Sequence, residues 1–235
     1  FTMKIAILGF GKMGHIIQQK AEEKGHEVVY TKTSSEEKGS LQDADVAIEF
    51  SVASAATDNL TTCFEKNIPV VCGTTGWLEK YDEMTKLCKV RNGALLYASN
   101  FSVGVNLFFN LNEKLAKLMA PWKEYAVSME EIHHTQKQDA PSGTAITLAE
   151  GIIKHSHYHH WKLEEAPENG IPITAIRKGD VKGTHRISYA SEIDTINITH
   201  EAHSRDGFAL GAILAAEWLQ NKKGIFSMKD VLQMK

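Results

Sequence analysis

Two histidines and a lysine stand close together in the middle of the chain. They are His133, His134 and Lys137, in the run EIHHTQKQDAPSGT that covers residues 131–144. Histidine transfers protons near neutral pH, and a lysine ammonium group attracts anions. Ser142 can cap a helix that starts directly after it, so that free backbone N–H groups would face a bound anion. This stretch predicts a carboxylate-binding site, and the alternative is two loop histidines beside a surface lysine.

A glycine-rich loop near the start of the chain is a second candidate site. Residues 9–14 read GFGKMG, follow an apolar run and precede a helix-like segment. In a GxGxxG loop the first glycine permits a tight turn, the second lets a pyrophosphate approach, and the third allows helix–strand packing. The loop therefore predicts dinucleotide binding, and the alternative is a purely structural turn. The predicted cofactor-binding residues of the loop are Gly9, Phe10, Gly11, Lys12, Met13 and Gly14.

The segment expected to meet the cofactor's ribose indicates which cofactor fits. A ribose-binding acid usually follows the glycine loop by about 20 residues. Here residues 30–35 read YTKTSS, and the next carboxylate is Glu36. A lysine between hydroxyl groups fits a 2′-phosphate better than a free 2′-hydroxyl, so we expect Lys32 to favour NADPH, or use of both NADPH and NADH. The alternative is that Lys32 is a solvated loop residue.

The order of apolar runs predicts an α/β fold. Up to residue 101, short apolar runs alternate with helix-like segments, which is typical of a Rossmann-like, doubly wound parallel sheet. The expected strands there are residues 5–8, 28–30, 46–48, 70–72 and 94–97, with a first helix over 12–24. Later segments predict helices over 105–119, 141–154, 208–220 and 228–232 and strands over 125–132, 173–177, 185–191 and 195–200.

The change of pattern near residue 101 divides the chain into two domains. We expect a dinucleotide-binding domain made of residues 3–101 and 205–235. We expect an inserted α+β domain, residues 102–204, with a mixed or antiparallel sheet, because apolar and polar residues alternate in its last two strands.

Composition excludes several functional classes. The chain has 235 residues, with 26 Lys and Arg against 29 Asp and Glu, and a formal charge of −3. This balance argues against nucleic-acid binding by counterion release. No apolar run reaches the roughly 18 residues that span a bilayer, and no segment resembles a signal peptide. Cys63, Cys72 and Cys88 show no CxxC spacing, so we expect reduced thiols in a cytoplasmic enzyme that binds neither nucleic acid nor membrane.

The run over residues 133–144 resembles the signature of the dihydrodipicolinate reductase family, also called 4-hydroxy-tetrahydrodipicolinate reductases. The family pattern is roughly His-His-x-x-Lys-x-Asp-Ala-Pro-Ser-Gly-Thr, which these residues reproduce. Other segments agree in the same order, so the resemblance covers nearly the whole chain. They are the glycine loop with Met13, CGTTG (72–76), ASNFSVGVN (98–106), RKGDVKGTH (177–185) and ITHEAHSR (198–205).

The resemblance implies a role for each matching residue. His133 would be the general acid or base, Lys137 a proton donor and carboxylate partner, and His134 a substrate ligand. Gly143 and Thr144 would hold a substrate carboxylate through their backbone amides. The cofactor would also meet Gly73, Thr74, Thr75, Ala98, Ser99, Asn100, Phe101 and Arg205. The acidic cofactor residue of many members is missing from the short stretch 31–43, so their NADH preference is not carried over.

The activity implied is NAD(P)H-dependent reduction of 4-hydroxy-tetrahydrodipicolinate to tetrahydrodipicolinate in diaminopimelate and lysine biosynthesis. Hydride would reach ring C4, His133 or Lys137 would supply the proton, and no metal is needed. The family also implies a homotetramer, with residues 102–204 as the domain that binds substrate and serves oligomerisation. The rivals are another two-domain NAD(P)-dependent oxidoreductase and a regulatory module that senses NADPH without turnover.

Two further groups of histidines each allow a binding role and a structural one. The stretch HSHYHH, residues 155–160, could bind a transition metal, but it lacks a cysteine or carboxylate at ligand spacing. We expect an exposed helix end and loop there. His200 and His203, close to Arg205, could face a cleft, and the alternative for them is a structural role.

Overall fold

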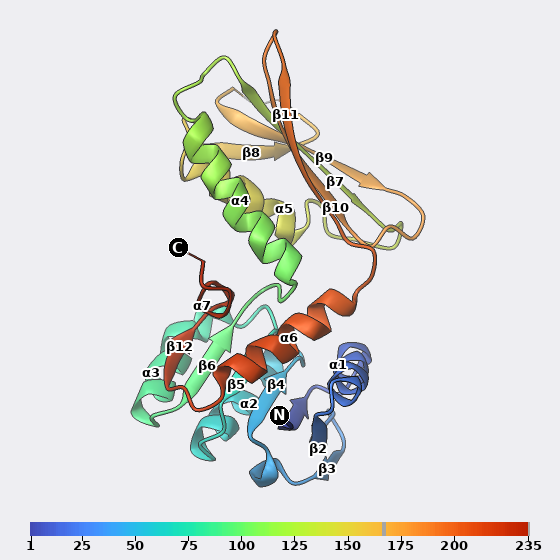
Figure 1. The fold of residues 1–235 in the computed structure, drawn as a ribbon, viewed down its shortest axis with the longest axis vertical. Coiled ribbons are helices and arrows are strands. Elements are labelled where there is room, and N and C mark those ends of the chain that lie inside the picture. The colour runs from blue at the N-terminus through green and yellow to red at the C-terminus, as the bar shows by residue number, and fades with distance from the viewer. Residues whose placement is uncertain (166–167, 235) are drawn as a thin grey trace. The chain divides into compact units, whose positions relative to one another are not determined.

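The computed structural model describes residues 1–165 and 168–234 (Figure 1). The chain forms two compact units, Phe1–Val103 with Asp206–Lys235, and Gly104–Arg205. The expected domain boundaries lie next to these divisions. Each unit has its own sheet and its own apolar core.

The first unit holds a seven-stranded sheet in the order β12-β6-β5-β4-β1-β2-β3. Every neighbouring pair is parallel except β2 and β3. The order reverses between β4 and β2, which flank β1, and this is the switch point where such sheets bind ligands. The strands are β1 (Lys4–Leu8), β2 (Glu27–Lys32), β3 (Glu37–Gly39), β4 (Val46–Glu49), β5 (Val70–Cys72), β6 (Ala94–Tyr97) and β12 (Gly224–Phe226).

Helices cover both faces of this sheet, as a doubly wound fold requires. Side chains alternate along a strand, so Ile5 and Ile7 pack with α1 and α6 while Ala6 and Leu8 pack with α2. In Figure 1, α6 crosses one face of the sheet. The helices are α1 (Lys12–Glu23), α2 (Ala53–Glu65), α3 (Tyr81–Val90), α6 (Asp206–Leu219) and α7 (Met228–Val231), with short 3-10 turns η1 (Leu41–Asp43) and η2 (Leu78–Lys80).

The second unit holds a mixed five-stranded sheet in the order β11-β10-β7-β9-β8. The β7 strand is antiparallel to β10 and parallel to β9. Alternate residues of β7 are buried, first Val127 and Met129 in the apolar core, then Glu131 and His133. The same face of β7 therefore carries both core and polar site residues. The elements are α4 (Val103–Met119), β7 (Ala126–His133), α5 (Gly143–Ile153), β8 (His160–Leu163), β9 (Gly170–Arg177), β10 (Thr184–Ala190) and β11 (Thr195–Glu201).

The expected strands and helices are all present, with ends that shift by a few residues. Three short strands, β3, β8 and β12, were not expected, and each lies at the edge of a sheet. Edge strands of three or four residues pair through their backbones on one side only, so they need no apolar run. The expectation of a loop at the end of residues 155–160 is wrong for His160, which begins β8.

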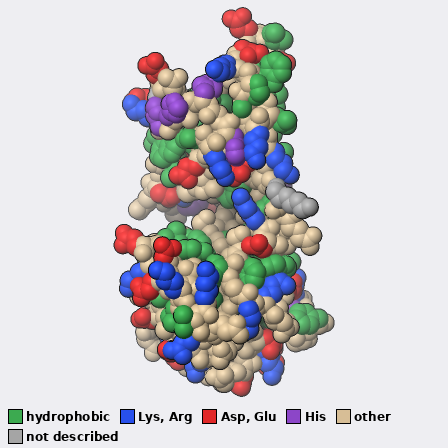
Figure 2. Space-filling model, turned by 90° about the vertical axis from the view of Figure 1, so that its left-hand side faces the viewer, with side chains coloured by type: hydrophobic (Ala, Val, Ile, Leu, Met, Phe, Trp, Pro, Cys, Tyr) green, Lys and Arg blue, Asp and Glu red, His purple; other side chains and the backbone are tan. Residues whose placement is uncertain are grey.

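The surface of the described residues carries mixed charge. Figure 2 shows acidic and basic side chains interspersed on the face that it presents. None of the described helices combines the length and the apolar character needed to cross a bilayer.

Gly211 in α6 tests how tightly this helix packs. A Cβ at Gly211 would lie 1.8 Å from the backbone oxygen of Phe101. We expect Gly211→Ala to lower the free energy of unfolding by at least about 2 kcal/mol, because overpacking forces the helix away. In the same helix, a Cβ at Gly207 would come no closer than 3.5 Å to another residue, Ser102.

Gly207→Ala is therefore the matched control, and we expect it to leave stability unchanged or to raise it by up to about 1 kcal/mol. Chemical denaturation of both variants measures the difference. Equal losses in the two variants would contradict close packing at Gly211.

Candidate functional site

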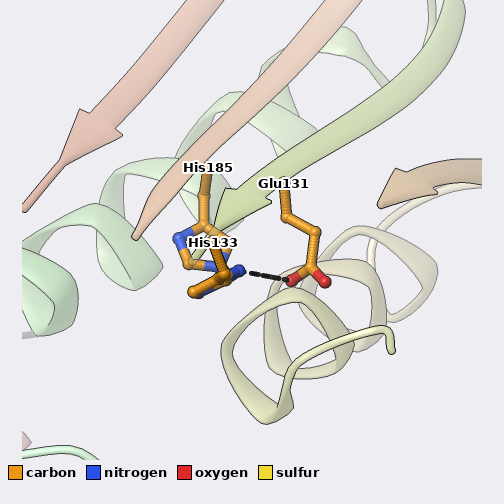
Figure 3. Close-up of side chains that lie close together, drawn as sticks. All are labelled: Glu131, His133 and His185. Carbon is orange, nitrogen blue, oxygen red and sulfur yellow. Dashed lines mark ion pairs between the residues drawn. The ribbon is translucent and has the colours of Figure 1, made fainter. Parts of the chain in front are cut away.

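A buried carboxylate lies near the end of β7 in the second unit. Glu131 is 0% exposed and accepts hydrogen bonds from the backbone N–H of Ser142, at 3.0 and 3.2 Å. Arg177 Nη2 lies 3.3 Å from its Oε1. His133 Nδ1 and His185 Nε2 each lie 3.6 Å from its Oε2. Figure 3 shows both imidazole rings beside this carboxylate.

The strand register brings these residues together. His185 on β10 pairs directly with Glu131 on β7. On the other side of β7, Arg177 of β9 pairs with His133. Ser142 reaches the cluster from the start of α5, where its hydroxyl also lies 3.1 Å from His185 Nε2. Three strands and one helix end therefore meet at a single carboxylate.

The cluster shifts the pKa values of its members. Burial by itself would raise the pKa of Glu131, but hydrogen bonds from His185 and Ser142 outweigh it and lower the pKa to about 2. Burial lowers the pKa of His133 to about 4, which the nearby Glu131 carboxylate opposes. This value includes the effects of His185 and Lys137, which act in the same direction as burial. At neutral pH Glu131 is charged and His133 is neutral.

The loop after β7 carries Lys137 and is tied to β9. Lys137 Nζ donates to both carboxylate oxygens of Asp139, at 2.7 and 2.9 Å. The guanidinium of Arg177 donates to the backbone oxygens of Lys137 and Asp139, at 3.2 and 2.7 Å. The Lys137 ammonium group is thus held by a carboxylate that an incoming anion could replace.

The start of α5 offers backbone donors. Ser142 is the N-cap of this helix, as expected, and its hydroxyl accepts a hydrogen bond from Ala145 N at 3.2 Å. Gly143 and Thr144 are the first two helical residues, whose N–H groups have no partner within the helix. A Cβ at Gly143 would meet nothing within 4 Å, so the backbone there is accessible. This helix start suits an anion.

His134 and Arg205 lie near a further carboxylate of the same unit. The pKa of Asp180 is lowered first by its hydrogen bond from Lys182, and then by the charges of Arg205 and His134. Burial lowers the pKa of His200, whose ring centre lies 5.9 Å from that of Phe108. This packing supports the structural alternative for His200.

A cavity of about 560 Å³ lies at the switch point of the first unit, beside the glycine loop. Gly9 and Phe10 donate their backbone N–H groups to the oxygen of Lys32, both at 2.9 Å. Gly9 has a φ of +96°, and a Cβ on it would lie 2.0 Å from the oxygen of Phe50. The cavity is lined by Gly9, Phe10, Gly11, Lys32, Thr33, Ser34, Phe50, Ser51, Val52, Ser54, Ala55, Asp58 and Asn59.

The two other glycines of the loop differ in their surroundings. A Cβ on Gly14 would lie 2.6 Å from the oxygen of Gly9, so the helix packs against the strand end. A Cβ on Gly11 would meet nothing within 4 Å, and Gly11 is the N-cap of α1. The loop thus leaves open space at a helix N-terminus, which fits the phosphates of a dinucleotide.

The remaining predicted cofactor residues of this unit do not line the cavity. Thr74 Oγ1 accepts a hydrogen bond from Ser51 N at 2.8 Å, and Gly73 packs so closely on the Phe50 ring that a Cβ would lie 2.2 Å away. Phe101 is 1% exposed and belongs to the apolar core. Also outside the cavity lining are Lys12, Met13, Gly14, Thr75, Ala98, Ser99 and Asn100.

Sequence reasoning missed the segment between β4 and α2, which supplies much of the cavity wall. Buried Glu49 at the end of β4 accepts hydrogen bonds from Ser51 Oγ, from Asn59 Nδ2 at 3.2 Å and from Cys72 Sγ at 3.2 Å. Small residues directly after a parallel strand were the available signal. Sequence reasoning also gave no role to Glu131, Arg177 and His185 in the second unit, although they lie within the quoted segments 131–144 and 177–185.

The spacing of Glu131, His133 and His185 would allow a metal ion, because their ligand atoms lie within 4.8 Å of one another. The guanidinium of Arg177 and the N–H of Ser142 already use the carboxylate, and their positive character disfavours a cation there. The expectation that no metal is needed stays a prediction.

The histidine-rich stretch 155–160 makes other contacts. Histidine side chains gather on the face shown in Figure 2. His155 Nε2 lies 3.6 Å from Glu113 Oε2, and the ring of His157 packs on Tyr158 with centres 4.3 Å apart.

Comparisons with known proteins bear on both units. Residues 3–101 match the domain family described as "Dihydrodipicolinate reductase, N-terminus", and residues 104–232 match "Dihydrodipicolinate reductase, C-terminus". The chain is 53% identical over 233 residues to a 4-hydroxy-tetrahydrodipicolinate reductase of Christiangramia forsetii, covering 98% of each chain. It is 37% identical over 242 residues to a protein of the same name from Alkaliphilus oremlandii, covering 99% of each.

A solved structure shares the fold. It is a dipicolinate-bound dihydrodipicolinate reductase from Paenisporosarcina sp. TG-14, with a TM-score of 0.77 and 23% sequence identity. The match covers 97% of this chain and 98% of that one.

The protonation of His133 can be measured directly. We expect its ring resonances in NMR to titrate with a midpoint near pH 4, because burial disfavours the charged imidazole. An unfolded histidine titrates near pH 6.5, so between these values the unfolded chain binds a proton that the folded protein does not. Acidification through this window therefore lowers the free energy of unfolding.

The variant His133→Gln assigns the resonance and should reduce that pH dependence. A midpoint near pH 6.5 for the native ring would contradict the prediction.

Proposed function

Because the chain belongs to the dihydrodipicolinate reductase family, we propose that His133, Lys137 and the first turn of α5 act together on its substrate. The protein is an oxidoreductase that reduces 4-hydroxy-tetrahydrodipicolinate in lysine and diaminopimelate biosynthesis. One observation supports this assignment of residues. The His133 imidazole and the start of α5 both contact Glu131, and the loop that carries Lys137 is hydrogen-bonded to Arg177, the ion-pair partner of Glu131.

The substrate carries two carboxylates, and this unit has donors for both. We assign one to the N–H groups of Gly143 and Thr144 at the start of α5. The Lys137 ammonium group and His134 would bind the other. The substrate would replace Asp139 as the partner of Lys137. Holding a flat ring at both ends lowers the barrier by restricting its orientation.

Binding of a doubly charged substrate would change the protonation of His133. Nearby negative charge favours the imidazolium form, so the pKa of His133 rises from about 4 when the dianion arrives. The ring would take up a proton as substrate binds. Nδ1 is turned toward Glu131, which leaves Nε2 as the atom that holds a proton for the substrate. Hydride transfer to the ring and loss of the 4-hydroxyl group as water together consume one proton, which His133, or Lys137 beside it, supplies.

A nicotinamide cofactor supplies the hydride when bound, and the glycine loop with the neighbouring cavity fits one. Gly9, Phe10 and Gly11 would meet the phosphates at the start of α1. Lys32 lines the cavity and would meet a 2′-phosphate, while its Nζ lies 3.7 Å from Glu37 Oε1. An ammonium group at the cavity wall supports our expectation of NADPH, or of both NADPH and NADH, and a 2′-phosphate would replace Glu37 as its partner.

We also propose that four copies associate in the cytoplasm. Of the apolar residues on β10 and β11, Ile187 and Tyr189 are buried in the unit's own core. Ile196 on β11 is 39% exposed, and Ile193 before it is more exposed still. These two side chains support association through this edge of the sheet.

Replacement of His133 or Lys137 tests the assignment. We expect His133→Ala to lower kcat by at least about 100-fold, because general acid catalysis is lost. We expect Lys137→Ala to lower kcat and to raise KM for the substrate. In both variants the Kd of NADPH should stay within about twofold of that of the unaltered protein, since the glycine loop is unchanged. Oxidation of NADPH followed at about 340 nm gives the kinetics.

The control is His157→Ala, which removes an exposed imidazole from a different loop and should leave kcat unchanged. Unaltered kinetics in both site variants would remove them from the reaction and would favour a different substrate or a sensing role.

Replacement of Lys32 tests cofactor choice. We expect Lys32→Ala to raise KM for NADPH about tenfold and to leave KM for NADH nearly unchanged, because only NADPH carries the 2′-phosphate. Lys38→Ala is the matched control, since Lys38 pairs with Glu36 much as Lys32 pairs with Glu37 but lies outside the cavity. Equal effects of Lys32→Ala on both cofactors would show that Lys32 does not contact the phosphate.

A further inference from the structure

We propose that the buried ion pair between Glu131 and Arg177 is a positioning device, which holds His133 and the Lys137 loop in register with the start of α5. This inference rests on the function proposed above. It adds two residues that carry no role in the substrate-binding or proton-transfer assignment, and both act through other groups.

Glu131 contacts both the proton-transfer group and the start of α5. It lies two residues before His133 on the same face of β7, so its carboxylate stands beside the imidazole. Its oxygens also accept the backbone N–H of Ser142, the residue that caps α5. The distance between the proton-transfer group and the anion-binding helix start is therefore set through one side chain.

Arg177 connects Glu131 to the loop that carries Lys137. Its Nη2 lies 3.3 Å from Glu131 Oε1 and donates to the oxygen of Asp139 at 2.7 Å, and its Nε donates to the oxygen of Lys137 at 3.2 Å. A planar guanidinium group is suited to this task, because its donors point in fixed directions. One side chain of β9 thus holds the loop on both sides of residue 138.

A contribution to stability alone does not explain this ion pair. Glu131 is completely removed from solvent, and buried ion pairs are often no more stabilising than apolar residues of similar volume. The hydrogen bonds of this pair end on the α5 cap and on the backbone of Lys137 and Asp139 in the loop, besides one from Arg177 to the oxygen of Ile176. Positioning therefore explains its contacts better than stability does.

The charged and titratable groups that face His133 come from every neighbouring element. They are Glu131 on β7, His185 on β10, Arg177 on β9 and Lys137 in the loop. Glu131 is the acidic member of this set and the one that favours the charged imidazole. Loss of its charge should therefore move the pH dependence assigned to His133 toward lower pH.

A double-mutant cycle separates positioning from stability. We expect Glu131→Gln and Arg177→Met each to lower the midpoint of thermal unfolding, because each leaves the other charge, fully buried in Glu131 and partly buried in Arg177, without its ion-pair partner. In the double variant the midpoint should return toward that of the native protein, while kcat stays at least about tenfold lower. The Kd of NADPH should remain within about twofold in all three variants.

A neighbouring ion pair provides the matched control. Glu130 and Arg186 lie 3.4 Å apart, with side chains that are 33% and 48% exposed. The double variant Glu130→Gln, Arg186→Met should leave kcat within about twofold of the native value.

Two further readouts keep the test decisive if the first double variant does not fold. Arg177→Lys keeps a positive charge but has no planar fork to reach the two loop carbonyls, and we expect kcat to fall at least about fivefold. In Glu131→Gln the limb of the pH–kcat/KM profile assigned to His133 should move down by about one pH unit.

The proposal is overturned if the double variant, or Arg177→Lys, keeps kcat within about twofold of the native value. It is also overturned if the pH profile of Glu131→Gln coincides with that of the native protein. If instead His133→Ala and Lys137→Ala keep native kinetics, the proposed function itself fails. Loss of activity in those two variants with full activity in the double variant would reject the positioning role alone.

Discussion

The fully buried carboxylate of Glu131 is the interaction on which the candidate site depends. An isolated buried charge is unfavourable, so this one persists only because a guanidinium, a helix-start N–H and two imidazoles surround it. The carboxylate keeps these partners only while β7, β9, β10 and α5 keep their relative positions. The same strand register fixes the position of His133.

The first unit relies on a different constraint, which is close approach of backbones. Gly9 and Gly14 have no room for a side chain, and Gly73 lies against the Phe50 ring. These contacts bring the carboxyl ends of β1, β4 and β5 close together around the cavity. Where close packing ends, at Gly11, the backbone at the helix start is open. The loop thus fits the dinucleotide that we propose for it, and the polar cluster of the second unit is the site that we propose for a small dianion.

The sequence could predict the parts of this fold that have strong periodicity. The buried parallel strands and the helices α1, α4 and α6 have apolar patterns long enough to be recognised, and the glycine loop and the residues 133–144 have specific motifs. The edge strands have no such pattern. Glu131 was visible as a neighbour of His133, but Arg177 and His185 lie 46 and 54 positions further along, and only sheet pairing brings them to it. Long-range register is the information that local patterns lack.

The most direct test of this account is NMR of the amide groups of Gly143 and Thr144 and of the His133 ring in the cofactor-loaded protein, titrated with dipicolinate. A dicarboxylate held between the α5 start and Lys137 should shift both amide protons downfield and should move the His133 ring toward its protonated form. Saturable binding that leaves these three signals in place would show that the anion binds elsewhere, and the account would be wrong.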